Sequence, residues 1–127
     1  MQMIDAEIIK KCEYMDNEAS LCFLLIKDDN IVYKSKSFLL LDSDILQFKE
    51  LFTAFNQGQL LSINNAPFSV DEKDNVENNY FTGKDNNGNI IHIKETLGFI
   101  FVVIVSPDSS LKRKEILELA HNLIEVK

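Results

Sequence analysis

The sequence has no tryptophan and contains two cysteines, two prolines and four glycines among its 127 residues. Two cysteines, Cys12 and Cys22, are too few for a disulfide scaffold, and a chain of this length buries enough surface to fold without one, so both are expected to be reduced thiols. The longest apolar run, Phe99 to Val105, is much shorter than the roughly 20 residues of a membrane-spanning helix. The amino terminus lacks the pattern of a signal peptide. These absences predict a soluble, cytoplasmic protein with no membrane span.

Basic residues are also few, because 13 Lys and Arg stand against 20 Asp and Glu, for a formal net charge of −7. An acidic chain is a poor general ligand for nucleic acid or for anionic membranes, since phosphates need a basic surface. The one dense basic cluster is Lys112, Arg113 and Lys114. It is interpreted either as a solvated helix face or as a contact patch for an acidic partner or a lipid head group. Cations at the start of a helix oppose its dipole, and this cost favours the contact patch.

Hydrophobic periodicity predicts three helices and seven strands. Met3, Ile4, Ile8, Cys12 and Met15 recur at helical spacing, and the run from 21 to 26 is typical of a strand that is buried on both faces. With little glycine and proline available, Asp28 to Asn30 and Asn64-Asn65 are expected to make the tight turns. The expected elements are a helix over 2–16, strands over 21–26 and from 31, a helix from a cap at Ser43 to a stop at Gly58, strands near 59–63, 66–70, 76–82, 89–95 and 98–106, and a helix near 108–126 capped by Asp108.

Consecutive strands joined by short turns imply an antiparallel sheet. The sequence therefore predicts a single domain over residues 1–127 of the α+β class. Its central antiparallel sheet of about six to seven strands is flanked by amino- and carboxy-terminal helices and a middle helix.

No pattern in the chain indicates catalysis or metal binding. His92 alternates with Ile91 and Ile93, which predicts that it faces outward at a surface, and His121 is placed on the polar side of the last helix. No catalytic triad, CxxC, HExxH or P-loop motif is present. The acidic stretches 71–75, expected to be a loop tip, and 84–89 do not have the ligand spacing of an EF-hand, and turn chemistry explains them better. We therefore expect neither an enzyme nor a cofactor.

The carboxy-terminal third carries a more specific pattern. Gly83 to Asn89 is a glycine- and asparagine-rich turn, Ile90-Ile91-His92-Ile93-Lys94-Glu95-Thr96 follows as an apolar strand, and a second apolar strand and a helix close the chain. Together with the order of the preceding elements, this ending resembles that of the profilins, and in particular a divergent, archaeal-type profilin.

The resemblance implies an actin-monomer-binding protein that regulates actin polymerisation and is associated with the cytoskeleton. Family members dock on actin through their last strands and the amino half of the last helix. The matching positions in this chain are Ser69, Val70, Glu72, His92, Lys94, Lys112, Arg113, Lys114 and Glu118.

Two further properties of the family find weak support in this sequence. Profilins bind polyproline between their terminal helices on aromatic side chains that include tryptophan, and only Tyr14 and His121 are aromatic candidates there. Weak or absent binding of proline-rich peptides is therefore expected. The acidic net charge likewise gives little support for binding to phosphoinositides.

Two other classes of protein compete with this interpretation. A roadblock- or longin-like scaffold that serves a small GTPase has similar α/β layers, but a roadblock-type domain has five strands where seven are predicted here. A PAS-type sensor needs polar groups inside a ligand cavity, and the pattern shows none.

Overall fold

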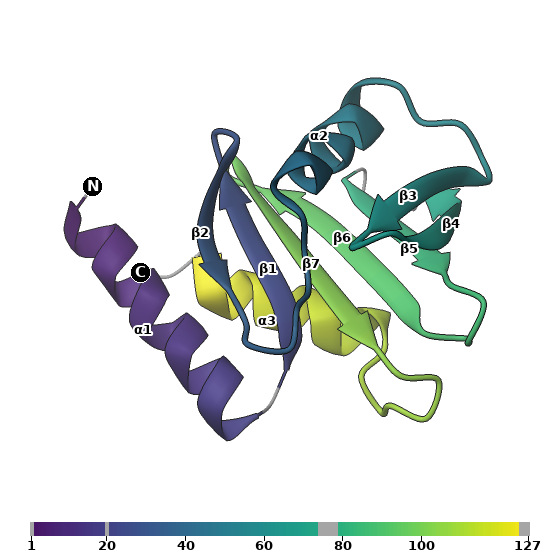
Figure 1. Cartoon of the computed structure of the whole chain (residues 1–127). Helices are drawn as coiled ribbons and strands as arrows, with labels where there is room; N and C mark the ends of the chain where they lie inside the picture. Colours follow the sequence, from purple (N-terminus) through teal and green to yellow (C-terminus); the bar gives the residue numbers. More distant parts are fainter. Residues whose placement is uncertain (1, 20, 74–78, 125–127) are drawn as a thin grey trace.

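The computed structural model describes residues 2–19, 21–73 and 79–124. Seven antiparallel strands form one sheet in the order β2-β1-β7-β6-β5-β4-β3 (Figure 1). None of the described helices is both long enough and apolar enough to cross a bilayer. The elements are α1 (Gln2–Glu18), β1 (Cys22–Lys27), β2 (Asn30–Lys34), the 3-10 turn η1 (Asp42–Asp44), α2 (Ile45–Thr53), β3 (Gln59–Ile63), β4 (Ala66–Lys73), β5 (Tyr80–Lys84), β6 (Ile90–Thr96), β7 (Phe99–Val105) and α3 (Arg113–Ile124).

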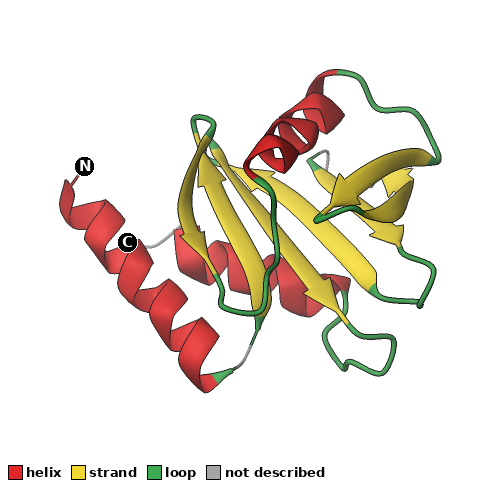
Figure 2. Ribbon diagram, in the orientation of Figure 1, coloured by secondary structure: helices red, strands yellow, loops and turns green. Residues whose placement is uncertain are grey.

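Helices cover both faces of this sheet, with α1 and α3 on one side and α2 on the other (Figure 2). The first core lies under α1 and α3, and its buried side chains include Ile8, Phe23 and Ile116. The second core lies under α2 and includes Phe48, Leu51 and the inward side chains of β3 and β4. The expected fold class, element order and burial of the first apolar strand are thereby confirmed.

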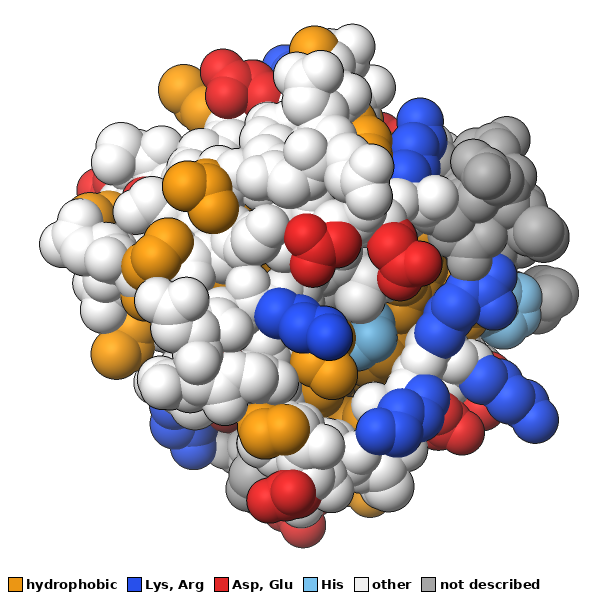
Figure 3. Space-filling view, turned by 90° about the vertical axis from the view of Figure 1, so that its right-hand side faces the viewer, with side chains coloured by type: hydrophobic (Ala, Val, Ile, Leu, Met, Phe, Trp, Pro, Cys, Tyr) orange, Lys and Arg blue, Asp and Glu red, His pale blue; other side chains and the backbone are white. Residues whose placement is uncertain are grey.

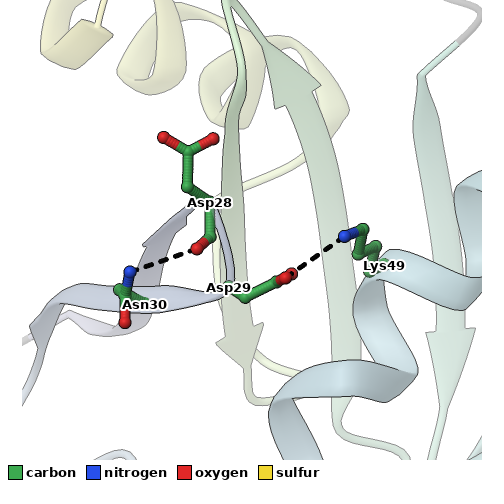
Figure 4. Close-up of polar contacts among 4 residues, drawn as sticks. All are labelled: Asp28, Asp29, Asn30 and Lys49. Atoms are coloured by element: carbon green, nitrogen blue, oxygen red, sulfur yellow. Dashed lines mark hydrogen bonds and ion pairs between the residues drawn. The ribbon is translucent and has the colours of Figure 1, made fainter.

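The tight turns are made by Asp and Asn, as expected. Asp28 and Asp29 have φ values of 52° and 66°, and Asn64 and Asn65 have values of 52° and 67°. Short polar side chains tolerate this left-handed region better than other non-glycine residues do. Asn30 Nδ2 donates a 3.1 Å hydrogen bond to the Asp28 carbonyl, which closes the β1–β2 turn (Figure 4).

The β1–β2 turn also contacts α2. Lys49 Nζ lies 3.2 Å from Asp29 Oδ2 (Figure 4). Both side chains are about half exposed to solvent, so the pair contributes less than about 1 kcal/mol to stability. It orients the turn rather than holding the fold together.

Several predicted boundaries are wrong. The last helix begins at Arg113 rather than near Asp108, because residues 106–112 form a turn in which Ser109 N donates to the Ser106 carbonyl. The middle helix begins at Ile45, after the short 3-10 turn η1 that contains Ser43, and ends at Thr53, well before Gly58.

Two further differences concern β4 and α1. β4 extends to Lys73, so residues 71–73 belong to a strand and not to a loop tip. On α1, Ile8 and Cys12 are buried as predicted, whereas the side chains of Met3 and Ile4 lie outside the described part of the chain. The predicted start of the strand over 76–82 and the predicted helix end at 126 also lie outside the described residues.

Gly83 of β5 lies opposite Val70 of β4. A Cβ atom at Gly83 would lie 2.6 Å from the carbonyl oxygen of Ser69, a distance that real Cβ atoms do not reach. Because both strands are held by ladder hydrogen bonds, neither backbone can move aside cheaply.

Replacing Gly83 by alanine should therefore lower the free energy of unfolding by about 3 kcal/mol through overpacking. Gly98 is the control, because it has a φ of 84° and no atom lies within 4 Å of the place that a Cβ would take. Gly98→Ala should cost only about 1 kcal/mol of backbone strain. Urea denaturation of the two variants measures the difference, and equal losses would contradict the steric explanation.

Candidate protein-binding surface

A row of side chains crosses three strands on the face of the sheet that carries α3. Glu72 of β4 lies opposite Thr82 of β5, and Thr82 lies opposite His92 of β6. Tyr80, two residues before Thr82 and hence on the same face, belongs to the core under α1 and α3. Glu72 remains exposed and Thr82 is half-buried. This part of the sheet is thus accessible from solvent beside the amino end of α3.

Basic side chains surround this row. Lys94 lies opposite Tyr80, and Lys84 lies opposite Ser69. At the start of α3, the Arg113 guanidinium lies 5.9 Å from the centre of the Tyr80 ring. We call this surface the basic face; it comprises Lys84, Lys94, Lys112, Arg113 and Lys114, together with Ser69, Glu72, Thr82 and Glu118.

The basic face is locally cationic on an acidic protein. Five of the thirteen basic residues in the chain belong to it. Figure 3 shows several Lys and Arg side chains between the centre and the right of the view, with Asp and Glu side chains among them and exposed apolar atoms beside them. A positive patch of this kind favours an acidic partner surface.

The amino end of α3 tolerates its three cations because of Glu115. The Lys112 backbone N–H donates a 3.0 Å hydrogen bond to Glu115 Oε1, the reciprocal half of a capping box. This hydrogen bond, together with the charges of Lys114 and Lys112, holds the pKa of Glu115 below its usual value. The carboxylate therefore stays ionised and offsets the unfavourable placement of the basic cluster.

His92 is buried beneath this surface, so the prediction that it faces outward is wrong. It does lie on the other side of β6 from Ile91 and Ile93, as the alternation predicts, but α3 covers that face and leaves the side chain only 5% exposed. Its Nδ1 lies 2.7 Å from the hydroxyl of Tyr80, which is also buried. Burial, with the nearby charge of Lys112, lowers the pKa of His92 from 6.5 to about 4. The imidazole is therefore neutral at pH 7 and supports the basic face from below.

Val70 is a second predicted contact residue that the structure buries. Its side chain is fully buried in the core under α2, on the opposite face of the sheet from Ser69 and Glu72. Neighbouring residues of a strand point to opposite faces, so Ser69 and Val70 cannot share one surface. Lys112, Arg113, Lys114 and Glu118 are exposed on or just before α3, Ser69 is half-buried on β4, and Lys94 is half-buried beside His92.

Sequence reasoning missed Thr82 and Lys84. Both alternate with Phe81 and Gly83, and this alternation was the signal that would have placed them on the face of Tyr80. The predicted strand over 76–82 ended before Lys84, which assigned that residue to the following turn.

A second concave surface runs between α1 and α3. This apolar groove has a volume of about 540 Å³ and is lined by Lys10, Lys11, Tyr14, Met15, Leu119, Asn122 and Leu123. Lys11 Nζ donates a 2.9 Å hydrogen bond to the Asn122 carbonyl across the groove. Tyr14 is 68% exposed. His121 lines a separate hollow with Leu117 and Glu118, so the structure does not bring the two predicted aromatic residues together.

In the acidic stretch at residues 84–89, Lys84 ends β5 and residues 85–89 form a turn. Asp85 Oδ1 accepts hydrogen bonds of 2.9 Å from the backbone N–H groups of Asn87 and Asn89. Slight burial acts to raise the pKa of Asp85, but these bonds and the Asn89 side chain hold it below its usual value. Among the described residues, no three His, Cys, Asp or Glu side chains are grouped so as to hold a metal ion.

Comparison with known proteins connects this fold with one family. No protein-family model matches the sequence, and no curated protein matches it either. Among solved structures, the chain is similar to LokiProfilin1, a Loki archaeal profilin, with a TM-score of 0.66, 17% identity, and coverage of 100% of this chain and 99% of the other.

Two profilins of Acanthamoeba castellanii are similar as well. Profilin IB has a TM-score of 0.62 at 11% identity and covers 81% of this chain and 80% of its own. Profilin II has a TM-score of 0.54 at 11% identity, with 96% and 90% covered. The protein therefore has the profilin fold.

The depressed pKa of His92 makes stability depend on pH. Between pH 6.5 and about 4 the unfolded chain binds a proton at this residue and the folded chain does not, so stability falls as the pH falls through this window. The full effect is about 3 kcal/mol.

The test is urea denaturation at a series of pH values. His92→Gln keeps a hydrogen-bonding side chain but removes the titration, and should flatten the loss of stability between pH 6.5 and 4. The control His121→Gln changes the exposed histidine and should keep the wild-type slope. If stability still falls with pH in His92→Gln as it does in the wild type, the acid sensitivity comes from carboxylates instead.

Proposed function

We propose that this protein binds monomeric actin through the basic face and thereby regulates actin polymerisation in the cytoplasm. The observation that carries the proposal is the grouping of Lys84, Lys94, Lys112, Arg113 and Lys114 on one surface of a chain whose net charge is −7. The profilin fold supports the assignment. The solved structures that share the fold are named as profilins.

The arrangement of charges suits recognition of an acidic protein. Exposed cations at the rim raise the rate of encounter by long-range attraction, and that rate falls as salt screens the charges. The neutral Tyr80–His92 pair below the face supplies a rigid floor, since both side chains are buried and bonded to each other. A rigid surface loses little entropy when a partner docks.

The roadblock- or longin-like alternative fits less well. Its discriminating feature is a sheet of five strands, and this sheet has seven. Binding, rather than catalysis, is the function that we propose.

Charge reversal at the start of α3 tests the proposal. Changing Lys112, Arg113 and Lys114 to Glu should weaken actin binding about 50-fold, because three exposed attractive pairs of up to about 1 kcal/mol each become repulsive. The measurement is the polymerisation of pyrene-labelled actin with added protein, supported by gel filtration of the complex. Raising the salt concentration should slow association of the wild type far more than that of the variant.

The matched control changes the net charge equally at other sites. Lys27, Lys36 and Lys49 lie at the end of β1, in the loop after β2 and on α2, outside the basic face. Changing these three to Glu should leave the effect on polymerisation within about twofold of wild type. The proposal fails if the wild type neither alters polymerisation nor elutes with actin, or if both triple variants lose binding alike.

The groove between α1 and α3 should bind polyproline poorly. Recognition of a polyproline helix relies on a set of aromatic side chains, and Tyr14 is the single aromatic residue among the described residues that line this groove. We expect a dissociation constant weaker than about 1 mM for a proline decamer. Titration followed by NMR measures it, with Tyr14→Ala as the control. Micromolar binding that is lost in Tyr14→Ala would overturn this expectation.

A further inference from the structure

The outer edge of β3 is covered by side chains instead of by another strand. β3 is the last strand of the sheet, so one of its edges has no strand partner among the described residues. Gln47 Nε2 donates a 2.7 Å hydrogen bond to the Ser62 carbonyl, and the Ser62 N–H donates a 2.8 Å bond back to Gln47 Oε1. A single side-chain amide thus makes both bonds that a paired strand residue would make.

Asp44 makes a similar contact with the backbone two residues further along the chain. The backbone N–H of Asn64 donates a 2.8 Å hydrogen bond to Asp44 Oδ2, and the Leu41 N–H donates a 3.0 Å bond to the same oxygen. Asp44 is only 5% exposed, and Gln47 Nε2 also donates to its carbonyl at 3.2 Å. The side chains of Asp44 and Gln47 therefore make, along this edge of β3, hydrogen bonds of the kind that a further strand would make.

The backbone groups that are bonded to Gln47 are also the groups that would pair β3 with the β3 strand of a second copy. Because backbone groups alternate along a strand, those of Leu60 point to the same outer edge as those of Ser62. An antiparallel pair of two β3 strands centred on Leu61 would place Leu60 opposite Ser62 of the other copy. The backbone N–H and carbonyl groups of Leu60 and Ser62 must then be available in each strand. In this structure those of Ser62 are bonded to Gln47.

The composition of β3 favours pairing with the β3 strand of a second copy. The strand reads Gln59-Leu60-Leu61-Ser62-Ile63 and has no charge, so two copies would not repel each other. Leu60 is 65% exposed beside the edge and would be buried in the pair. The opposite edge strand, β2, ends in Lys34, a residue type that discourages strand addition.

We propose that Gln47, braced by Asp44, keeps this protein monomeric by closing the β3 edge against the β3 edge of a second copy. An uncharged edge with free backbone groups is a template for strand addition, and a two-fold axis makes antiparallel pairing of identical strands self-complementary. The role is independent of actin binding, because Gln47 and Asp44 belong to the α2 side of the molecule.

Gln47→Ala tests the proposal directly. Its mass should rise from that of a monomer towards twice that value as concentration increases, measured by size-exclusion chromatography with light scattering, while wild type stays monomeric. The matched control is Gln57→Ala, which changes an exposed glutamine of the turn before β3 and should stay monomeric. A Gln47→Ala protein that is folded by circular dichroism and monomeric at every concentration would overturn the proposal.

A second variant separates edge pairing from misfolding. Leu60→Lys added to Gln47→Ala puts a charge on the opened edge and should restore the monomer without restoring thermal stability. Association that persists in the double variant would assign it to unfolded chains and would refute pairing through β3.

Hydrogen exchange of the wild type gives a further test that needs no variant. The amides of Ser62 and Asn64 should exchange at least about tenfold more slowly than the amide of Leu60, since the first two are bonded by side chains of η1 and α2. Equal exchange at all three positions would show that the edge is not closed in solution and would contradict the proposal.

Discussion

Strand β7 is the element on which the rest of the structure depends. It lies between β1 and β6 and pairs with both along its length. Phe99, Phe101, Val103 and Val105 point into the core under α1 and α3, while Ile100 and Val102 point into the core under α2. Burial on both faces explains why the strand is a continuous apolar run, and it couples two cores that would otherwise be separate.

The two sides of the sheet are closed to different extents. On one side α2 covers the middle strands and, with Asp44 and Gln47, closes the edge at β3. On the other side α3 contacts β6 and β7 and leaves Glu72 on β4 exposed. The basic face exists because of this incomplete cover. A helix that reached β4 would bury the positions available to a partner.

Much of this arrangement could be read from the sequence. Alternation and helical spacing predicted the element order, the antiparallel sheet and the turns at Asp28-Asp29 and Asn64-Asn65. The error at His92 has a clear cause, because local pattern says which residues share a face and does not say what covers that face. The pattern placed His92 on the correct side of β6 but in solvent, because nothing local to its strand reveals that α3 lies above it. The family resemblance put Val70 beside Ser69 on one surface, although strand alternation separates them.

The sequence by itself determined the periodicities, the turn chemistry and the excess of acidic charge, since these depend on composition and on residues close together in the chain. Only the tertiary structure decided which charges meet. Lys84, Lys94 and Arg113 come from two strands and a helix, and they share a surface because strand pairing and the packing of α3 bring them there. The contact of Gln47 with Ser62 was decided in the same way, since fifteen residues separate them and no local pattern links a helix side chain to the edge of a later strand.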